Sequence, residues 1–367
     1  MNAPVVVKLG SNLVVDGEHR PRWELVNGVA SEVASTVRGG TPVVIVSSGA
    51  IALGSAIAGL RSGRRKLGPL QAASALGQAE LQRVWHEAFA PLGLPVAQVL
   101  LTPVEITERR SYLNVGNALR ALFEVPAVPI LNENDATATD EISFGDNDVL
   151  AAQVAVLLRA ARLFLLTSAD GVMSHPPGVP GATLVADGAE LGAAVLGPPT
   201  SLGAGGIESK IRASSLAAAG GVETVIASPN ALGSLLRGEP AGTRFAPAST
   251  DESAFKLWLR YGKATASQVN VDAGAARAIT EQGSSLLAVG ITSWTHDFRA
   301  GDGLDICHPE ETVIARGISS VDAKDVQARQ PGVEVVHRDR LALIARPRAT
   351  APSEASPDLN DPGPLLS

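Results

Sequence analysis

Short apolar runs that end in small polar turns constrain the fold of this chain more than any other feature. These runs lie at residues 4–7, 42–46, 94–101, 125–131, 163–166 and 223–227. Unbroken apolar runs of this kind are typical of strands buried on both faces, and segments with helical spacing separate them here. Strands that alternate with helices predict a three-layer α/β/α sandwich around a mainly parallel sheet.

The pattern changes near residue 250. Residues 250–263 have the spacing of one linking helix, and further strands are expected at 285–289, 304–308, 312–315 and 334–337. Short strands joined by close turns are typical of a small β-barrel. We therefore predict a sandwich domain at residues 1–249, a linker at 250–269 and a barrel domain at 270–345. The tail at 346–367 is rich in Pro, Ser and Ala, and we expect it to be disordered.

Charge and cysteine content narrow the class of protein. The net charge of −7 argues against nucleic acid or an anionic membrane as the main partner. The single cysteine, Cys307, excludes an intrachain disulfide and fits a reducing cytoplasm. We see neither a signal peptide at the start nor the roughly 18 consecutive apolar residues of a membrane span. We therefore expect a cytoplasmic protein.

An acidic stretch follows the fourth apolar run. Residues 132–148 carry six carboxylates and three amides with almost no aliphatic residues, so they cannot build a core. Such a stretch can bind an ammonium group, hold Mg²⁺ directly or through water, or orient a polar substrate. The alternative is a solvated acidic loop. Because ligands bind at the ends of strands in open α/β sheets, we interpret this stretch as the floor of an active site.

Three turns carry the parts of a phosphate site. Lys8 follows the first strand, Ser48 and Gly49 follow the second, and residues 203–210 form a glycine-rich loop that ends in Lys210 before a helix. Neither the GxGxxG nor the GxxxxGK[ST] pattern is present. Backbone amides of glycine turns at helix starts nevertheless bind anions well. We favour a phosphate site over the alternative of a flexible surface loop with an incidental lysine.

The motifs together resemble a known family. They are Val-Lys8-Leu-Gly-Ser, Val-Ser-Ser48-Gly-Ala-Ile-Ala, Arg-Ser-Tyr-Leu-Asn114, Asn132-Glu-Asn-Asp135-Ala, Gly-Asp-Asn147-Asp and Gly-Gly-Ile-Glu-Ser-Lys210. In order and spacing, residues 4–246 are similar to the glutamate 5-kinases of the amino acid kinase superfamily. Val271-Asp-Ala-Gly-Ala, Gly283-Ser-Ser-Leu-Leu and Val336-His-Arg-Asp339 resemble the PUA domain that some of these enzymes carry. Acetylglutamate, aspartate and uridylate kinases share the sandwich, but this second domain points away from them.

The resemblance implies a reaction and a site. ATP, with Mg²⁺, phosphorylates the side-chain carboxylate of L-glutamate to L-glutamyl 5-phosphate, the first step towards proline. The implied catalytic residues are Lys8 and Lys210, and the implied amino-acid ligands are Ser48, Asp135 and Asn147. The implied nucleotide-binding residues are Lys8, Thr167, Ser168, Ala204, Gly205, Gly206, Ile207, Glu208, Ser209 and Lys210. No residues are assigned to the metal.

Expected partners follow from the same resemblance. It implies a homo-oligomer, either a dimer or a tetramer, and glutamyl phosphate reductase as a functional partner. PUA domains often bind RNA, but residues 270–345 hold 7 Lys and Arg against 11 Asp and Glu, a balance of −4. Because RNA affinity depends on neutralising phosphates, we expect no RNA binding.

One position departs from the family. Ser168 stands where an aspartate is usual, and that aspartate is expected to orient the two lysines. The segment at 172–177 also differs from the family pattern. Two alternatives therefore stay open at this point: a relative that acts on another acidic amino acid, and a weakened regulatory or sensing protein. The presence of Lys8, Lys210, Asp135 and Asn147 favours an active enzyme.

Overall fold

The structure is a computed structural model of the whole chain, in which most residues are described. They are residues 2–60, 66–102, 105–106, 109–137, 146–175, 181–191, 206–248, 253–261, 263, 265–308, 312–327 and 332–344. The tail predicted to be disordered lies outside these ranges, as does the middle of the acidic stretch, 138–145.

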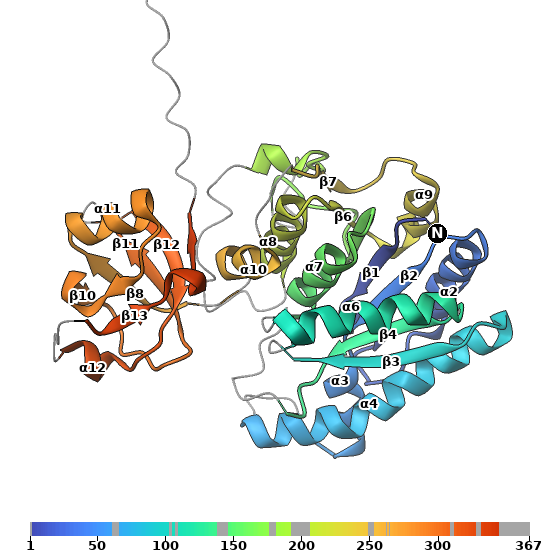
Figure 1. Ribbon diagram of the computed structural model, residues 1–367. Coiled ribbons are helices and arrows are strands. Elements are labelled where there is room, and N and C mark those ends of the chain that lie inside the picture. The colour runs from blue at the N-terminus through green and yellow to red at the C-terminus, as the bar shows by residue number, and fades with distance from the viewer. Residues whose placement is uncertain are drawn as a thin grey trace, which may run out of the picture.

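A seven-stranded sheet forms the centre of the N-terminal domain (Figure 1). Its strands are β1 (Val5–Leu9), β2 (Val43–Ser47), β3 (Val96–Leu101), β4 (Val128–Glu133), β5 (Arg162–Leu166), β6 (Glu223–Ala227) and β7 (Thr243–Phe245). The spatial order is β3-β4-β2-β1-β5-β6-β7, and only β7, at one edge, runs antiparallel to its neighbour. The predicted mainly parallel sheet is confirmed.

Helices cover both faces of this sheet. They are α1 (Ser11–Val14), α2 (Trp23–Arg38), α3 (Ala50–Ile57), α4 (Leu67–Phe89), α6 (Arg109–Glu124), α7 (Asp146–Leu158), α8 (Ile207–Ala219) and α9 (Leu232–Arg237). Alternate residues of a strand face opposite sides, so Val6 of β1 packs with α6, α7 and α8. Val5 and Val7 pack on the other side with α2, α4 and α9. The α/β/α sandwich is therefore confirmed.

Helices α3 and α4 touch along their backbones. A Cβ atom added to Gly54 would lie 1.7 Å from the carbonyl oxygen of Ala73, and one added to Gly77 would lie 1.8 Å from that of Ala50. No side chain other than hydrogen fits at either position. This close approach brings the Ser74 and Gln78 side chains of α4 towards the carboxyl ends of the strands, where both are buried.

The C-terminal domain is rich in short strands, as predicted. A five-stranded sheet has the order β10-β8-β11-β12-β14, and β13 pairs with β9. The bounds are β8 (Thr265–Val271), β9 (Leu286–Leu287), β10 (Ile291–Trp294), β11 (Gly303–Cys307), β12 (Val313–Ile318), β13 (Glu334–Val336) and β14 (Leu341–Leu343). Helices α11 (Ala273–Gln282) and α12 (Ala323–Gln327), which the sequence did not suggest, complete it. Strand β8 begins inside the stretch predicted to be a linker.

Helix α10 (Ala254–Tyr261) lies between the two domains (Figure 1). Leu257 and Leu259 are fully buried in the cluster that contains the α7 and α8 side chains, and Ile318 and Ala342 of the C-terminal sheet belong to the same cluster. Arg316 Nη1 donates a hydrogen bond of 2.7 Å to the carbonyl oxygen of Arg260, the penultimate residue of the helix. The C-terminal sheet is thus attached to the sandwich through α10.

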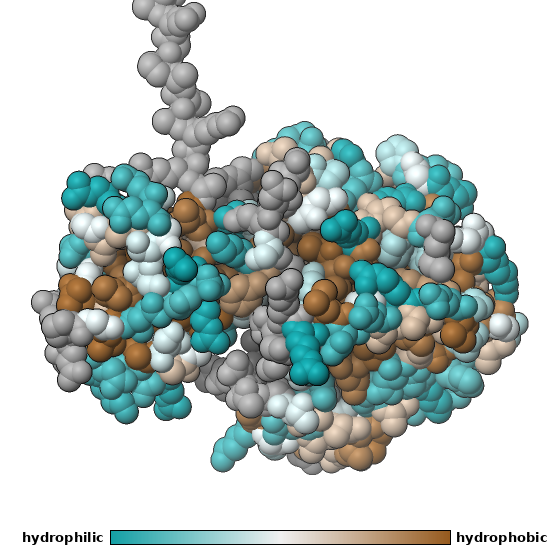
Figure 2. All heavy atoms as spheres, in the orientation of Figure 1, coloured by the Kyte–Doolittle hydropathy of each residue, from teal (hydrophilic) through white to brown (hydrophobic). Residues whose placement is uncertain are grey.

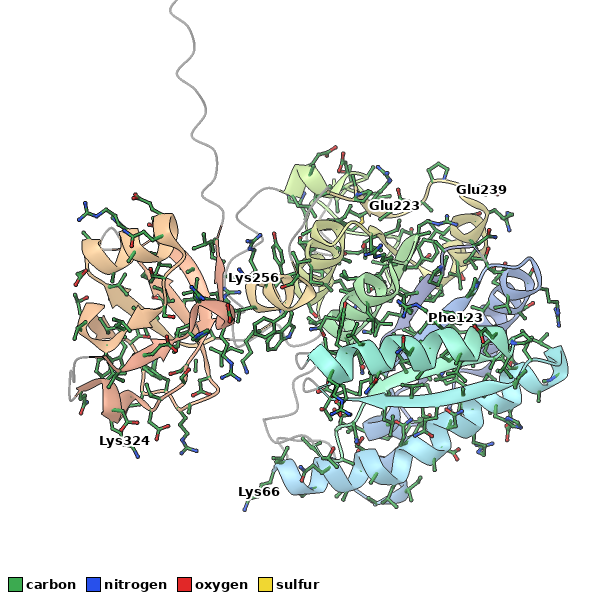
Figure 3. All side chains as sticks on the ribbon, viewed as in Figure 1. Lys66, Phe123, Glu223, Glu239, Lys256 and Lys324 are labelled. Atoms are coloured by element: carbon green, nitrogen blue, oxygen red, sulfur yellow. The ribbon has the colours of Figure 1, made fainter. Side chains whose placement is uncertain are left out.

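Polar side chains are spread over the outside of both domains in the face shown by Figure 2. Charged residues such as Glu223, Glu239 and Lys324 extend away from the ribbon (Figure 3).

Among the helices that the structure describes, none has both the length and the apolar character needed to cross a membrane.

Candidate active site

The carboxyl ends of the central strands carry the predicted site. Lys8 is the fourth residue of β1, and Ser48 follows β2, where its peptide N–H donates to the carbonyl oxygen of Leu9 at 3.0 Å. The turn after Ser48 depends on Gly49, whose φ of 128° disfavours a side chain. Asn132 lies within β4, and Asp135 follows that strand. Three segments that are distant in sequence therefore meet at the carboxyl ends of the strands, as expected of an α/β active site.

A buried carboxylate joins the two predicted catalytic lysines. Lys8 Nζ lies 2.5 Å from Asp148 Oδ1, and Lys210 Nζ lies 3.1 Å from Asp148 Oδ2. The Ser209 hydroxyl donates to the same Oδ2 at 3.1 Å. Exposure is 3% for Lys8, 5% for Lys210 and 0% for Asp148, so water does not screen these contacts. Asp148 thus sets the spacing of the two ammonium groups.

Burial and the neighbouring charges together shift the pKa values of Lys8 and Asp148. Burial lowers the pKa of Lys8, and the positive charge of Lys210 lowers it further, while Asp148 opposes both effects. Burial alone would raise the pKa of Asp148, but the charges and hydrogen bonds of Lys8 and Lys210 outweigh it and hold that pKa below its ordinary value. With all three groups ionised, the cluster carries one net positive charge, which suits it to bind an anion.

The expectation that Ser168 leaves the lysines without an orienting aspartate is wrong. Asp148 holds both lysines, and Ser168 is exposed at the end of β5. Thr167 is half-buried, and its N–H donates to the carbonyl oxygen of Ala227 at 2.9 Å. The sequence did place Asp148 in the acidic stretch, but nothing in the composition distinguished it from the five other carboxylates there.

This geometry predicts that an aspartate at position 168 has little effect on turnover. Because Ser168 makes no described contact with either lysine, Ser168→Asp should leave kcat within about a factor of two, less than 0.5 kcal/mol of barrier height. Steady-state kinetics at saturating substrates would check this. A severalfold increase in kcat would show that residue 168 reaches the lysines after all during turnover.

The predicted amino-acid ligands form a hydrogen-bonded group. Asn147 Nδ2 donates to Ser48 Oγ at 3.0 Å and to Asn132 Oδ1 at 2.9 Å. Asp135, which is 8% exposed, accepts a hydrogen bond of 3.4 Å from Ser74 Oγ of α4. Sequence analysis missed Ser74 and the structural part played by Asn132. Strand β4 also extends two residues beyond the predicted apolar run, because Asn132 and Glu133 continue its pairing with β3. The buried Asn132 side chain donates to Gln78 and accepts from Asn147.

Burial raises the pKa of Asp135 to about 6, and the hydrogen bond from Ser74 only partly opposes this. The unfolded chain therefore binds fewer protons than the folded one between pH 3.8 and about 6. Protonated Asp135 favours the folded state over the unfolded one. This contribution to the free energy of unfolding is complete below pH 3.8 and is lost as the pH rises through about 6. At pH 7.5 the ionised carboxylate destabilises the fold by about 3 kcal/mol.

We therefore expect Asp135→Asn to raise the thermal midpoint at pH 7.5 while weakening amino-acid binding. Asparagine keeps an acceptor for Ser74 but cannot attract a substrate ammonium group. The stability gain should shrink as the pH falls from about 7 to 4, because Asp135 itself becomes neutral there. Thermal melts across this range, together with KM values, measure both effects. A variant less stable than the wild type at pH 7.5 would contradict the burial argument.

The start of α8 provides the described part of the predicted nucleotide loop. Gly206 precedes the helix in an extended conformation, Ile207 and Glu208 are exposed, and Ser209 and Lys210 are buried against Asp148. Free N–H groups at a helix start favour a phosphate. Ala204 and Gly205, also predicted to bind the nucleotide, lie outside the described residues. The predicted helix start at Ile211 is one turn too late, since α8 begins at Ile207.

The described side chains do not converge on a protein-only metal site. Within the ranges given above, no group of three or more His, Cys, Asp or Glu side chains is placed to hold a metal. Asp148 is already engaged by two ammonium groups. Mg²⁺ usually takes one or two carboxylates together with substrate phosphates and water.

Comparisons with known proteins show the family of this chain. The amino acid kinase family model matches residues 3–228, and the PUA domain model matches residues 267–340. A glutamate 5-kinase from Sphingopyxis alaskensis is 39% identical over 93% of this chain and 97% of its own length. Those from Corynebacterium glutamicum (38%, covering 93% and 96%) and Microcystis aeruginosa (35%, covering 96% and 99%) are similar to nearly the same extent. The chain therefore belongs to the amino acid kinase family and, within it, to the glutamate 5-kinases.

Proposed function

We propose that this enzyme transfers the γ-phosphoryl group of ATP to the side-chain carboxylate of L-glutamate and releases L-glutamyl 5-phosphate and ADP. The observation that carries the proposal is the buried Lys8–Asp148–Lys210 cluster beside the Ser48–Asn147 pair. The full-length relatives named glutamate 5-kinase support the choice of glutamate over another acidic amino acid. They equally favour an active enzyme over a sensing protein.

The proposed phosphoryl transfer requires no general base from the protein. The side-chain carboxylate of glutamate, with a pKa of about 4.3, is already ionised at pH 7 and needs no general base. Two anions must instead be brought into line, and charge that spreads over the transferred phosphoryl oxygens must be neutralised. Lys8 and Lys210, held at a fixed spacing by Asp148, are suited to that task.

Roles follow for the other residues. Ser48 and Asn147 would hold the amino acid, and the Asp135 carboxylate would attract its α-ammonium group. Thr167, Ser168 and residues 204–210 would contact the nucleotide. Mg²⁺, bound through the ATP phosphates, would supply further neutralisation of their charge. Because Asp148 is committed to the lysines, its part is to fix their ammonium groups.

Trapping the product tests the proposal. Hydroxylamine attacks an acyl phosphate, forms a hydroxamate and releases inorganic phosphate. With ATP, Mg²⁺ and glutamate, we expect hydroxamate in proportion to ADP, and much less of both with aspartate or without Mg²⁺. Folded enzyme that gives no hydroxamate from glutamate above the level seen without enzyme would refute the proposal. Product from another acidic amino acid alone would identify the first alternative reading.

We propose the remaining features on the family resemblance and the composition. They are domains at residues 1–249 and 270–345 around a linker at 250–269, assembly as a dimer or tetramer, a cytoplasmic location and hand-over of the acyl phosphate to glutamyl phosphate reductase. Acyl phosphates hydrolyse readily, which favours such a hand-over. The charge balance of −4 in residues 270–345 supports the proposal that RNA is not a partner.

A further inference from the structure

A chain of buried amides connects helix α4 to the proposed amino-acid site. Gln78 Oε1 accepts a hydrogen bond of 2.8 Å from Asn132 Nδ2. Asn132 Oδ1 accepts one of 2.9 Å from Asn147 Nδ2, which also donates to Ser48 Oγ at 3.0 Å. Gln78 is 9% exposed and Asn132 is 2% exposed. The chain thus runs from α4 through β4 and α7 to the residue after β2.

The polarity of this chain is fixed at one end. The peptide N–H of Glu133 donates to Asn147 Oδ1 at 3.2 Å, and a peptide N–H can only donate. Asn147 must therefore turn its oxygen towards Glu133 and its nitrogen towards Asn132. Asn132 must in turn present its oxygen to Asn147 and its nitrogen to Gln78. Each amide is held in one of its two orientations, and Gln78 has to be an acceptor.

This polarity determines what the site can offer a substrate. Both hydrogens of Asn147 Nδ2 are used, one by Asn132 and the other by Ser48. Ser48 Oγ therefore accepts from Asn147, and no described residue accepts its own proton. That proton remains available for an oxygen of the ligand.

The position of Gln78 is itself determined by the fold. It follows Gly77, whose missing side chain lets α4 lie against the backbone of α3. A buried amide without a partner is costly, so the Gln78–Asn132 contact stabilises only one arrangement of both side chains.

We propose that Gln78 is a positioning residue for the amino-acid substrate: through Asn132 it locks the Asn147 amide, so that the Ser48 hydroxyl proton points to a substrate oxygen. This inference rests on the proposed function, since it assigns the site its amino acid. Gln78 acts through Asn132 and Asn147. Substrate contacts held equally in the bound state and the transition state change KM more than kcat.

A matched pair of variants tests the acceptor. Gln78→Met keeps the length of the side chain but removes the acceptor, whereas Gln78→Glu keeps an acceptor for Asn132. We expect Gln78→Met to raise the KM for glutamate about tenfold, with kcat and the KM for ATP within about twofold, because a misdirected Ser48 hydroxyl loses a substrate hydrogen bond worth about 1.4 kcal/mol. Gln78→Glu should recover most of the loss. Gln82→Met is the control, because the buried Gln82 Oε1, one turn further along α4, has no hydrogen-bond partner.

A double-mutant cycle tests whether Gln78 acts through Asn147. In an Asn147→Ala background, Gln78→Met should change the KM for glutamate by less than about twofold, because the Asn147 amide that Gln78 orients is then absent. Equal effects of Gln78→Met in both backgrounds would overturn the inference, as would an unchanged KM in the single variant or an equal rise in Gln82→Met. Wild-type enzyme that does not phosphorylate glutamate refutes the proposed function instead; the same ratios measured with the amino acid it does accept then decide the part played by Gln78.

Discussion

Asp148→Asn is expected to lower kcat by about 10²–10³-fold, the effect of losing one well-placed electrostatic group in an active site. Asp148 is the anion between Lys8 and Lys210, at 2.5 and 3.1 Å. Without it, two buried ammonium groups face each other, and the pKa of Lys8, already lowered by burial, should fall further. One lysine then loses its proton or its place. The KM values for glutamate and ATP should change much less than kcat.

Two comparisons separate this effect from simple loss of structure. Asp148→Glu keeps the charge and should recover part of kcat, while Ser209→Ala removes only the hydroxyl that donates to Asp148 Oδ2 and should cost about tenfold or less. Breaking a buried ion pair costs about 3–5 kcal/mol of stability, so kinetics must be measured well below each thermal midpoint. Full activity in folded Asp148→Asn would show that the lysines need no anion between them.

Lys210→Ala should depress kcat by a similar factor, about 10²–10³-fold, because it removes the charge that we propose meets the transferred phosphoryl group. The cluster then becomes neutral, since Lys8 and Asp148 alone remain. The KM for glutamate should stay within about threefold, as Lys210 has no described contact with Ser48 or Asn147. Single-turnover and steady-state rates together would separate the chemical step from product release.

Lys324→Ala is the matched control for this substitution. Its side chain is 75% exposed in the C-terminal domain and, among the described residues, pairs only with Asp322 at the surface. Exposed pairs of this kind contribute about 0–1 kcal/mol, so neither activity nor stability should change measurably. If Lys210→Ala left kcat within about twofold of the wild type, the assignment of Lys210 to the phosphoryl group would be wrong.

The sequence was sufficient to predict the sheet, because its strands are buried on both faces and their apolar runs stand out. The predicted runs at 42–46 and 163–166 differ by only one residue at their ends from β2 and β5. It was also sufficient to predict Lys8, Ser48 and Asn147 at one sheet edge, since parallel strands deliver their ends together.

The sequence alone did not show which side chains these residues contact. The contact between Lys210 and Asp148 spans 62 positions, and that between Asn132 and Gln78 spans 54. Each depends on how two elements pack, which local periodicity does not report. Gln78 in particular lies on a helix whose pattern predicts only a buried face. Helix α11 was missed although Asp272, whose side chain accepts from the N–H of Ala275, is a recognisable N-cap residue.

The attachment of α10 to both domains bears on how this enzyme could have been assembled from older parts. Leu257 and Leu259 share one apolar cluster with α7 and α8, whose first turns hold Asp148 and Lys210, and with Ile318 and Ala342 of the C-terminal sheet. Domain boundaries usually fall in exposed linkers that few contacts cross. Here removal of the C-terminal domain would expose to water the side of α10 that packs against Ile318 and Ala342, one helix away from Asp148 and Lys210. The C-terminal domain therefore covers part of the hydrophobic core of the kinase domain.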